Sequence, residues 1–454
     1  MAKKTKNAAA SRTAAKASDG GTLSVFDATV LIVGMIIGVG IFALPPLVAT
    51  MSASPAIFLG FWLLGGLITL IGVLCYAELG TAFPGPGGEY RYLGKAYGQK
   101  LAVLFAWARG TVIQTGAIAA VAFVYGDYMS QLIPIPGGYS SAIHAGIALI
   151  VLTWINIAGL DPTKKTQALL TTLEVSSLVA VTLAGLFAAP APSAAVSTAG
   201  TQAMGAAGLA LVFVLFTYGG WNEISYLTSD MKDVRKNLAK TLAISTAIVT
   251  LLYLLINYAY LQALGLQGLR DSKAVGVDVL RLVMGDRGGS ILAAMVVICA
   301  LSTLNATVLT GGRTYYALGR DLKAFNVFSS WDEKKHQPAN ALLLQGAIAL
   351  ALIILGGLTR GGLQTMIDYT APVFWGFLLL VGIGIFILRK QKPEAPNPYR
   401  VPLYPITPIL FCLACGWLLY STLSYAGTGS LFGVGVLALG LPLLFLSAKN
   451  TKTR

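Results

Sequence analysis

The stretch Val33-Gly-Met-Ile-Ile-Gly-Val-Gly-Ile-Phe-Ala-Leu-Pro-Pro46 interrupts a long apolar run with closely spaced glycines. A second apolar run, Leu211-Val-Phe-Val-Leu-Phe-Thr-Tyr-Gly-Gly-Trp-Asn222, is interrupted by a glycine pair. A continuous membrane helix needs no such breaks. A helix that stops within the bilayer leaves bare carbonyls on one half and bare amides on the other. The two stretches therefore predict two discontinuous membrane spans.

The composition is that of a membrane protein. The chain has 454 residues, of which 56% are hydrophobic and 11% are charged, against about 25% charged residues in a typical soluble domain. Its mean hydropathy is +0.73. Apolar runs long enough to cross a bilayer recur along the whole chain. We therefore predict an all-α integral membrane protein without a separate soluble domain.

The apolar runs predict twelve spans, and the breaks fall in the first and the sixth. Because an odd number of spans separates them, spans 1 and 6 run in opposite directions, so spans 1–5 and 6–10 are expected to form a 5+5 inverted repeat with spans 11 and 12 appended. We predict a tail at 1–22, a core at 23–390 and a last part at 391–454. The predicted spans are 25–50, 54–83, 98–131, 139–160, 165–189, 205–229, 238–264, 288–312, 339–358, 364–388, 404–426 and 430–447.

The net charge of +14 is spread over short loops and forms no continuous basic face, so no nucleic-acid partner is expected. Most lysine and arginine residues fall on one side of the predicted topology, which the positive-inside rule assigns to the cytoplasm. This predicts a multi-pass protein of the cell's inner (plasma) membrane with both termini cytoplasmic. Residues 1–22 read as a disordered cytoplasmic tail, and no signal peptide is expected.

The sequence contains few of the motifs that are typical of enzymes. It has no metalloprotease, nucleophile-elbow or P-loop motif, and it has no charged ring or filter-like repeat of a channel. The two histidines and four cysteines, including the pair Cys412 and Cys415 in an apolar run, suggest no metal site. We expect neither an enzyme nor a bound cofactor.

The two breaks supply complementary polarity. After Gly38-Val39-Gly40 the chain must restart as a half-helix, whose free amides suit a carboxylate. The half-helix ending near Phe216 leaves carbonyls that suit an ammonium group, and Phe216 can close over the bound molecule. Matched breaks in two halves of a chain are typical of the substrate site of a secondary transporter for a small zwitterion. The alternatives are close helix packing by the glycines and a core role for Phe216.

Four motifs resemble those of the amino acid–polyamine–organocation superfamily, and within it the L-type amino acid transporter branch. They are Gly38-Val-Gly-Ile-Phe42, Pro84-Gly-Pro-Gly-Gly-Glu-Tyr-Arg-Tyr92, Phe216-Thr-Tyr-Gly-Gly-Trp-Asn222 and Tyr399-Arg-Val-Pro-Leu-Tyr-Pro405. The resemblance covers the chain beyond residue 22. It implies a permease or exchanger that moves amino acids across a lipid bilayer by alternating access.

The resemblance also implies roles for individual residues. Gly38, Val39 and Gly40 would meet the substrate carboxylate. Carbonyls of Ile36, Phe216 and Gly219 would meet the amine, with Phe216 as an outer gate. Asn222 looks like the family's polar residue on the inner half of span 6. Val39 departs from the family, which often has serine or threonine there.

Glu174 is the larger departure, because many relatives carry a lysine at this place on span 5. A carboxyl inside a membrane costs about 2.5–3.5 kcal/mol even on permissive scales, so it usually has a function or a partner. We expect Glu174 to bind a coupling proton, or a cation such as sodium held with Ser302 and Thr303. The alternative is a neutral acid hydrogen-bonded to the backbone.

Glu223, next to Asn222, has two interpretations. It lines the cavity and favours a cationic substrate, or it faces cytoplasmic water. The first supports an alternative function: a cationic amino acid or polyamine antiporter or importer of the same fold. Uptake competition between neutral and dibasic amino acids discriminates between them.

Other charges are expected to be structural. Arg109 and Asp127, both on span 3, are expected near the membrane interfaces. Asp27 and Glu78 are expected to be gate or loop-anchoring charges near the cytoplasmic side. The loop after span 3 has no cysteine, so no disulfide-linked subunit is expected.

Overall fold

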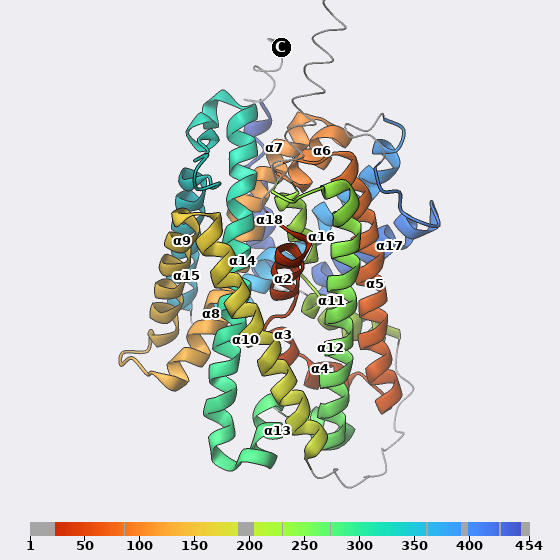
Figure 1. The fold of residues 1–454 in the computed structure, drawn as a ribbon, viewed down its shortest axis with the longest axis vertical. Coiled ribbons are helices and arrows are strands. Elements are labelled where there is room, and N and C mark those ends of the chain that lie inside the picture. The colour runs from red at the N-terminus through yellow and green to blue at the C-terminus, as the bar shows by residue number, and fades with distance from the viewer. Residues whose placement is uncertain are drawn as a thin grey trace, which may run out of the picture.

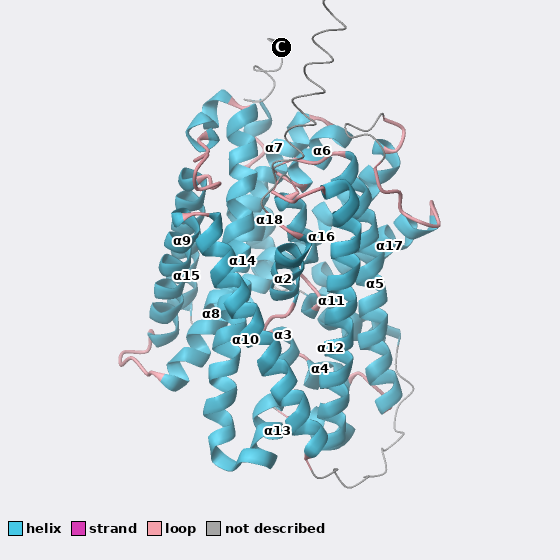
Figure 2. Ribbon diagram, viewed as in Figure 1, coloured by secondary structure: helices cyan, strands magenta, loops and turns pink. Residues whose placement is uncertain are grey.

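The computed structural model describes residues 23–85, 87–188, 204–228, 230–272, 274–359, 362–391, 398–425 and 428–445. Within these ranges the regular elements are helices (Figure 2), and the β pairing consists of the isolated bridges Leu23–Met231 and Asp332–Gln337. The predicted all-α class is confirmed. The predicted tail at 1–22 lies outside the described residues.

The helices follow one another along the chain with short connections. Their bounds are α2 Val25–Ile36, α3 Gly40–Ala43, α4 Pro45–Thr50, α5 Pro55–Ala82, α6 Glu89–Tyr97, α7 Gln99–Ala108, η1 Arg109–Ile113, α8 Gln114–Leu132, α9 Ser140–Ala158, α10 Leu160–Phe187, α11 Met204–Thr217, η2 Trp221–Leu227, α12 Val234–Asp271, α13 Val275–Met284, η3 Gly285–Arg287, α14 Gly288–Asp321, η4 Lys323–Ser329, α15 Ala339–Thr359, α16 Gly362–Leu388, α17 Ile406–Tyr425 and α18 Thr428–Leu439.

In the described part of the chain, 10 helical stretches are long and apolar enough to cross a membrane. Predicted spans 6 and 12 correspond to shorter apolar helices. Span 6 falls short because α11 stops after 14 residues at the second break, and span 12 corresponds to the short stretch Leu431–Phe445. The chain is a multi-pass membrane protein, while the twelve-span count and the inverted repeat remain predictions.

The broken helix lies at the centre of the bundle (Figure 1). In this view α2 and α3 are flanked by α10 and α12, α9 and α15 lie together at one side, and α5 and α17 lie at the other. Contacts join α12 to α2, α5 and α10, and α14 to α8 and α10. The end of the bundle that carries α6, opposite α13, is the predicted cytoplasmic end.

Local sequence explains how the first span begins. The Ser24 hydroxyl accepts a hydrogen bond from the Asp27 amide at 3.1 Å, and the Asp27 carboxylate accepts one from the Ser24 amide at 3.0 Å. This reciprocal capping box satisfies two amides that a helix start leaves free. Asp27 is therefore a structural anchor at the start of α2.

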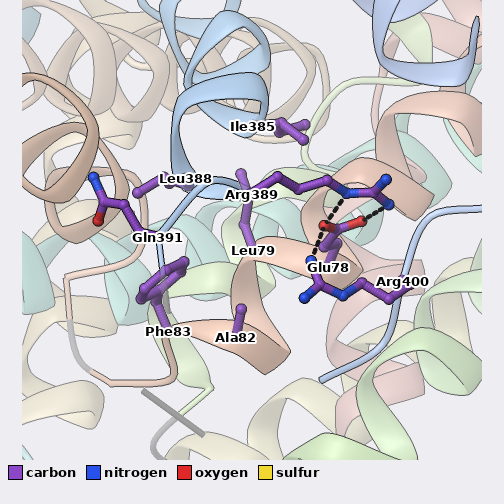
Figure 3. A pocket seen from close by; sticks show the side chains of 9 residues that line it. All are labelled: Glu78, Leu79, Ala82, Phe83, Ile385, Leu388, Arg389, Gln391 and Arg400. Carbon is purple, nitrogen blue, oxygen red and sulfur yellow. Dashed lines mark hydrogen bonds and ion pairs between the residues drawn. The ribbon is translucent and has the colours of Figure 1, made fainter. Parts of the chain in front are cut away.

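Glu78 also has the expected anchoring role (Figure 3). Its carboxylate accepts hydrogen bonds from Arg389 Nε and Nη2, each at 2.7 Å, and from the Val401 amide at 2.7 Å. Arg400 Nη1 lies 3.2 Å from Glu78 Oε1. The carboxylate thus ties the segment after α16 to α5.

Two short α-helices were not predicted. The helix α6 follows Gly87 and Gly88, which both have positive φ angles. The helix α13 precedes the long helix α14. Both are strongly amphipathic and too short to span a bilayer, so a search for long apolar runs passes over them.

Candidate functional site

The first break separates α2 from α3. The helix α2 ends at Ile36, and the Ile37 amide makes its last hydrogen bond, to the Val33 carbonyl, at 2.8 Å. The chain turns through Gly38 and Val39 and restarts as α3 at Gly40. The first amides of a restarted helix have no partner within it. The predicted discontinuity of span 1 is therefore present, at the residues that the sequence indicated.

The second break separates α11 from η2. The helix α11 ends at Thr217, and the Gly219 amide donates to the Phe216 carbonyl at 3.1 Å. Gly220 has φ 101°, a left-handed conformation that glycine adopts readily. The chain then continues as the 3₁₀ turns of η2 instead of an α-helix. The predicted discontinuity of span 6 is present as well.

The two breaks touch one another. A Cβ on Gly220 would collide with the Met35 carbonyl oxygen, and one on Gly40 would lie 3.2 Å from Thr217 Cγ2. Backbone of span 1 therefore packs directly on backbone of span 6, as only glycine permits at this distance. Residues far apart in the sequence thereby form one site.

Tyr253 of α12 bridges the two carbonyl ends. Its hydroxyl lies 2.9 Å from the Ile36 carbonyl and 3.1 Å from the Thr217 carbonyl. The Ile36 carbonyl, which we predicted to meet an amine, thus has a tyrosine partner here. Sequence reasoning missed Tyr253, because one tyrosine in an apolar span carries no signal of what it faces.

Of the other predicted residues of span 6, Phe216 lies before the break and Asn222 lies after it. The Phe216 side chain is 44% exposed, unlike a core aromatic. Below the break, Asn222 Nδ2 donates to Glu89 Oε1 at 2.9 Å. Asn222 is thus engaged by α6 instead of lying free toward a cavity.

Glu223 has a buried counter-charge. Arg109 Nη2 lies 2.7 Å from Glu223 Oε2, and the Arg109 side chain is 1% exposed. The prediction that Arg109 lies near a membrane interface is therefore wrong. Its position in η1 turns it into the bundle, toward the acidic partner that the sequence did not reveal. Asp127 is exposed near the end of α8, and its place near a membrane interface remains a prediction.

The predicted coupling residues gather beside the first break. Glu174 of α10 is 0% exposed, and neither carboxylate oxygen has a hydrogen-bond partner. The Ser302 hydroxyl of α14 accepts from Gln167 Nε2 at 2.9 Å. The Thr303 hydroxyl lies 3.3 Å from the Gly34 carbonyl and 3.2 Å from the Ile37 carbonyl.

The arrangement has the polarity for a small zwitterion. The start of the half-helix α3 lies beside the carbonyl ends of α2 and α11 at the centre of the bundle, where peptide dipoles are weakly screened. Among the residues that the structure describes, no group of three or more histidine, cysteine and acidic side chains has the geometry for a metal ion. Broken helices that meet within a membrane bundle are typical of transporters.

Comparison with known proteins agrees with this class. Residues 23–439 match the sequence profile of the amino acid permeases, and the chain belongs to that family. Large neutral amino acids transporter small subunit 2 of Mus musculus is 29% identical over 95% of this chain and 83% of its own length. Asc-type amino acid transporter 1 of Homo sapiens is 29% identical, covering 93% and 82%. The b(0,+)-type amino acid transporter 1 of Mus musculus is 30% identical, covering 84% and 79%.

These matches confirm the resemblance to the amino acid–polyamine–organocation superfamily and its L-type branch. The family and these relatives are transporters, so the prediction that the chain is not an enzyme is confirmed. The roles assigned to single residues remain predictions.

Proposed function

We propose that this chain is a secondary active amino acid transporter, a permease or exchanger that works by alternating access. The observation that carries the proposal is the direct contact between two helix breaks at the centre of the bundle. We place it in the cell's inner (plasma) membrane with twelve spans, a 5+5 repeat and both termini cytoplasmic, from the charge bias of its loops.

In this proposal the amino acid lies across the two breaks. The α-carboxylate meets the amides of Gly38, Val39 and Gly40, and the α-amine meets carbonyls at the ends of α2 and α11. The Ile36 carbonyl keeps a second lone pair for the amine while it accepts from Tyr253, because a carbonyl oxygen has two. Phe216 covers the molecule from the predicted outer side.

We propose a substrate with a neutral side chain. The ion pair with Arg109 neutralises Glu223, so this carboxylate is not available to recognise a dibasic substrate. The alternative, a cationic amino acid or polyamine carrier, requires that the substrate displace a guanidinium bonded at 2.7 Å. The relatives' names include large neutral amino acids, which agrees with the first choice.

We propose that the coupling ion is a proton carried by Glu174. An ionised carboxylate without a partner is expensive in an apolar interior, so this site calls for a proton or a cation. Two titratable groups near it, Tyr253 of α12 and Cys299 of α14, are not cations. Sodium bound with Ser302 and Thr303 is the competing choice.

The deciding experiment is uptake into proteoliposomes. Labelled leucine, alanine, lysine and agmatine are presented with and without sodium over a pH series, with protein-free liposomes as the blank. Uptake of a neutral amino acid that follows the proton gradient and ignores sodium supports the proposal. Competition by agmatine but not by neutral amino acids refutes the neutral substrate, and strict dependence on sodium refutes the proton.

A disulfide-linked subunit is not part of the proposal. The mouse relative is named a small subunit, which is a statement about that protein. The four cysteines of this chain are free and lie within membrane helices α5, α14 and α17. We therefore propose that purified chain alone transports in liposomes.

A further inference from the structure

A buried ion pair lies beneath the second break, outside the predicted substrate contacts with the two breaks. Arg109 opens η1, a single π-helical turn between α7 and α8. Such turns are rare and frequently mark functional sites. The carbonyls that the wider turn releases are satisfied by tyrosines: Tyr315 donates to Gly110 at 2.8 Å and Tyr369 to Thr111 at 3.0 Å. The turn is therefore held in place by its surroundings.

Glu223 connects the short segment η2 to two long helices. Its Oε2 accepts from Arg109 Nη2 of η1 at 2.7 Å and from Gln114 Nε2 of α8 at 3.3 Å. It also accepts a short hydrogen bond from the Thr310 hydroxyl of α14. One carboxylate thus fastens the inner half of the broken span to both helices at once.

A second contact strengthens the attachment. The Arg109 guanidinium lies over the Tyr226 ring of η2, with Cζ 3.7 Å from the ring centroid. Cation–π contacts of this kind gain strength when water is excluded, and the Tyr226 side chain is fully buried. Arg109 therefore holds η2 through a charge and through an aromatic ring.

Arg109 also has another acceptor within reach. Glu89 Oε2 of α6 lies 3.9 Å from Arg109 Nη1, and neither Nη1 nor Nε of Arg109 has a hydrogen-bond partner. The helix α6 packs on α7, next to Arg109. When Glu223 moves away from Arg109, the guanidinium still has the Glu89 carboxylate nearby. Opening of the pair therefore does not leave a buried cation without a counter-charge.

We propose that the Arg109–Glu223 pair is a latch that keeps η2 closed over the predicted cytoplasmic end of the transporter. The inference rests on the proposed alternating-access function. When the cavity opens to that end, η2 moves away from η1 and α14, and the pair separates. The pair then sets the balance between the two states of the carrier without touching the substrate.

The test measures the exposure of η2 in the purified full-length protein. Ser225 lies on η2, is 2% exposed, and its hydroxyl has no hydrogen-bond partner, so Ser225→Cys is a conservative probe. Its labelling rate with a hydrophilic maleimide is followed by mass spectrometry. The parent chain, which keeps its four native cysteines, gives the background.

We expect Glu223→Gln to raise the labelling rate of this probe roughly tenfold, because truncating one partner of a buried charge pair removes a large part of the attachment. Arg109→Gln should raise it similarly. The double variant should raise the rate by less than the product of the two single effects, because both changes break the same ion pair. Asp321→Asn is the matched control: this carboxylate accepts from Tyr90 at 2.9 Å and does not touch η2, so the rate should not change.

Two results overturn the latch. One is a labelling rate in both single variants that stays within twofold of the rate of the Ser225→Cys protein alone. The other is a double variant whose labelling rate rises by the product of the two single increases. Should Glu223→Gln or Arg109→Gln fail to elute as a monodisperse protein, Thr310→Val and Arg109→Lys take their places, with smaller increases expected. Labelling needs no transported substrate. The labelling experiment can therefore refute the latch while uptake supports the transporter, and uptake can refute the transporter while labelling supports the latch.

Discussion

Replacement of Gly220 by alanine tests the contact between the two breaks. The residue has φ 101°, and an added Cβ would collide with the Met35 carbonyl oxygen. A left-handed conformation costs a non-glycine residue about 1–2 kcal/mol, and overpacking costs about 1–3 kcal/mol more. The least expensive relief is to move η2 away from α2, which separates the groups proposed to hold the amino acid.

The expected consequence is a loss of affinity. If the whole strain of at least about 2 kcal/mol appears in binding, the dissociation constant rises about 30-fold or more, since 1.4 kcal/mol corresponds to a factor of ten. The assay is equilibrium binding of the labelled amino acid with the highest uptake in the panel above. Gly416→Ala is the control, because a Cβ there meets no atom within 4 Å. An unchanged dissociation constant in Gly220→Ala would refute the reasoning.

Three further changes test other parts of the site. Gly40→Val should abolish uptake while membrane insertion persists, because the branched side chain meets Thr217, which lies 3.2 Å from a Cβ at this position; retained uptake would exclude the carboxylate site. Glu174→Gln should remove the pH dependence of uptake, because the amide cannot take up a proton in this range; a persisting dependence would eliminate Glu174 as the coupling group. Phe216→Ala should speed release of bound amino acid toward the predicted outer side, measured by dilution of preloaded protein, and an unchanged release rate would argue against a gate.

The sequence predicted the class of the fold because each membrane helix is a long apolar run that can be recognised without knowing its neighbours. Long apolar runs gave the bounds of α5, α9 and α15 to within a few residues, since each helix satisfies its own backbone in lipid. The breaks at Gly38–Gly40 and Gly219–Gly220 were predicted for the same local reason. Helices too short to span, such as α6, lack this signal and were missed.

The sequence did not predict which side chains pair with one another within the site. Glu223 could be read as a substrate ligand or as a solvent-facing charge, and Arg109 was expected at an interface. Their pairing joins residues 114 positions apart, and it depends on how η2 packs against the π-helical turn. No pattern along the chain encodes which buried side chain of one helix meets which of another.

The sequence by itself thus determined that the chain crosses a membrane as helices and that two of them stop midway. Both follow from local rules on how each segment satisfies its own peptide groups. Only the tertiary structure decided that the two interruptions touch, that Tyr253 joins their carbonyl ends, and that a buried arginine neutralises Glu223. These depend on the packing of distant helices, where the position of a side chain is set by its neighbours in space.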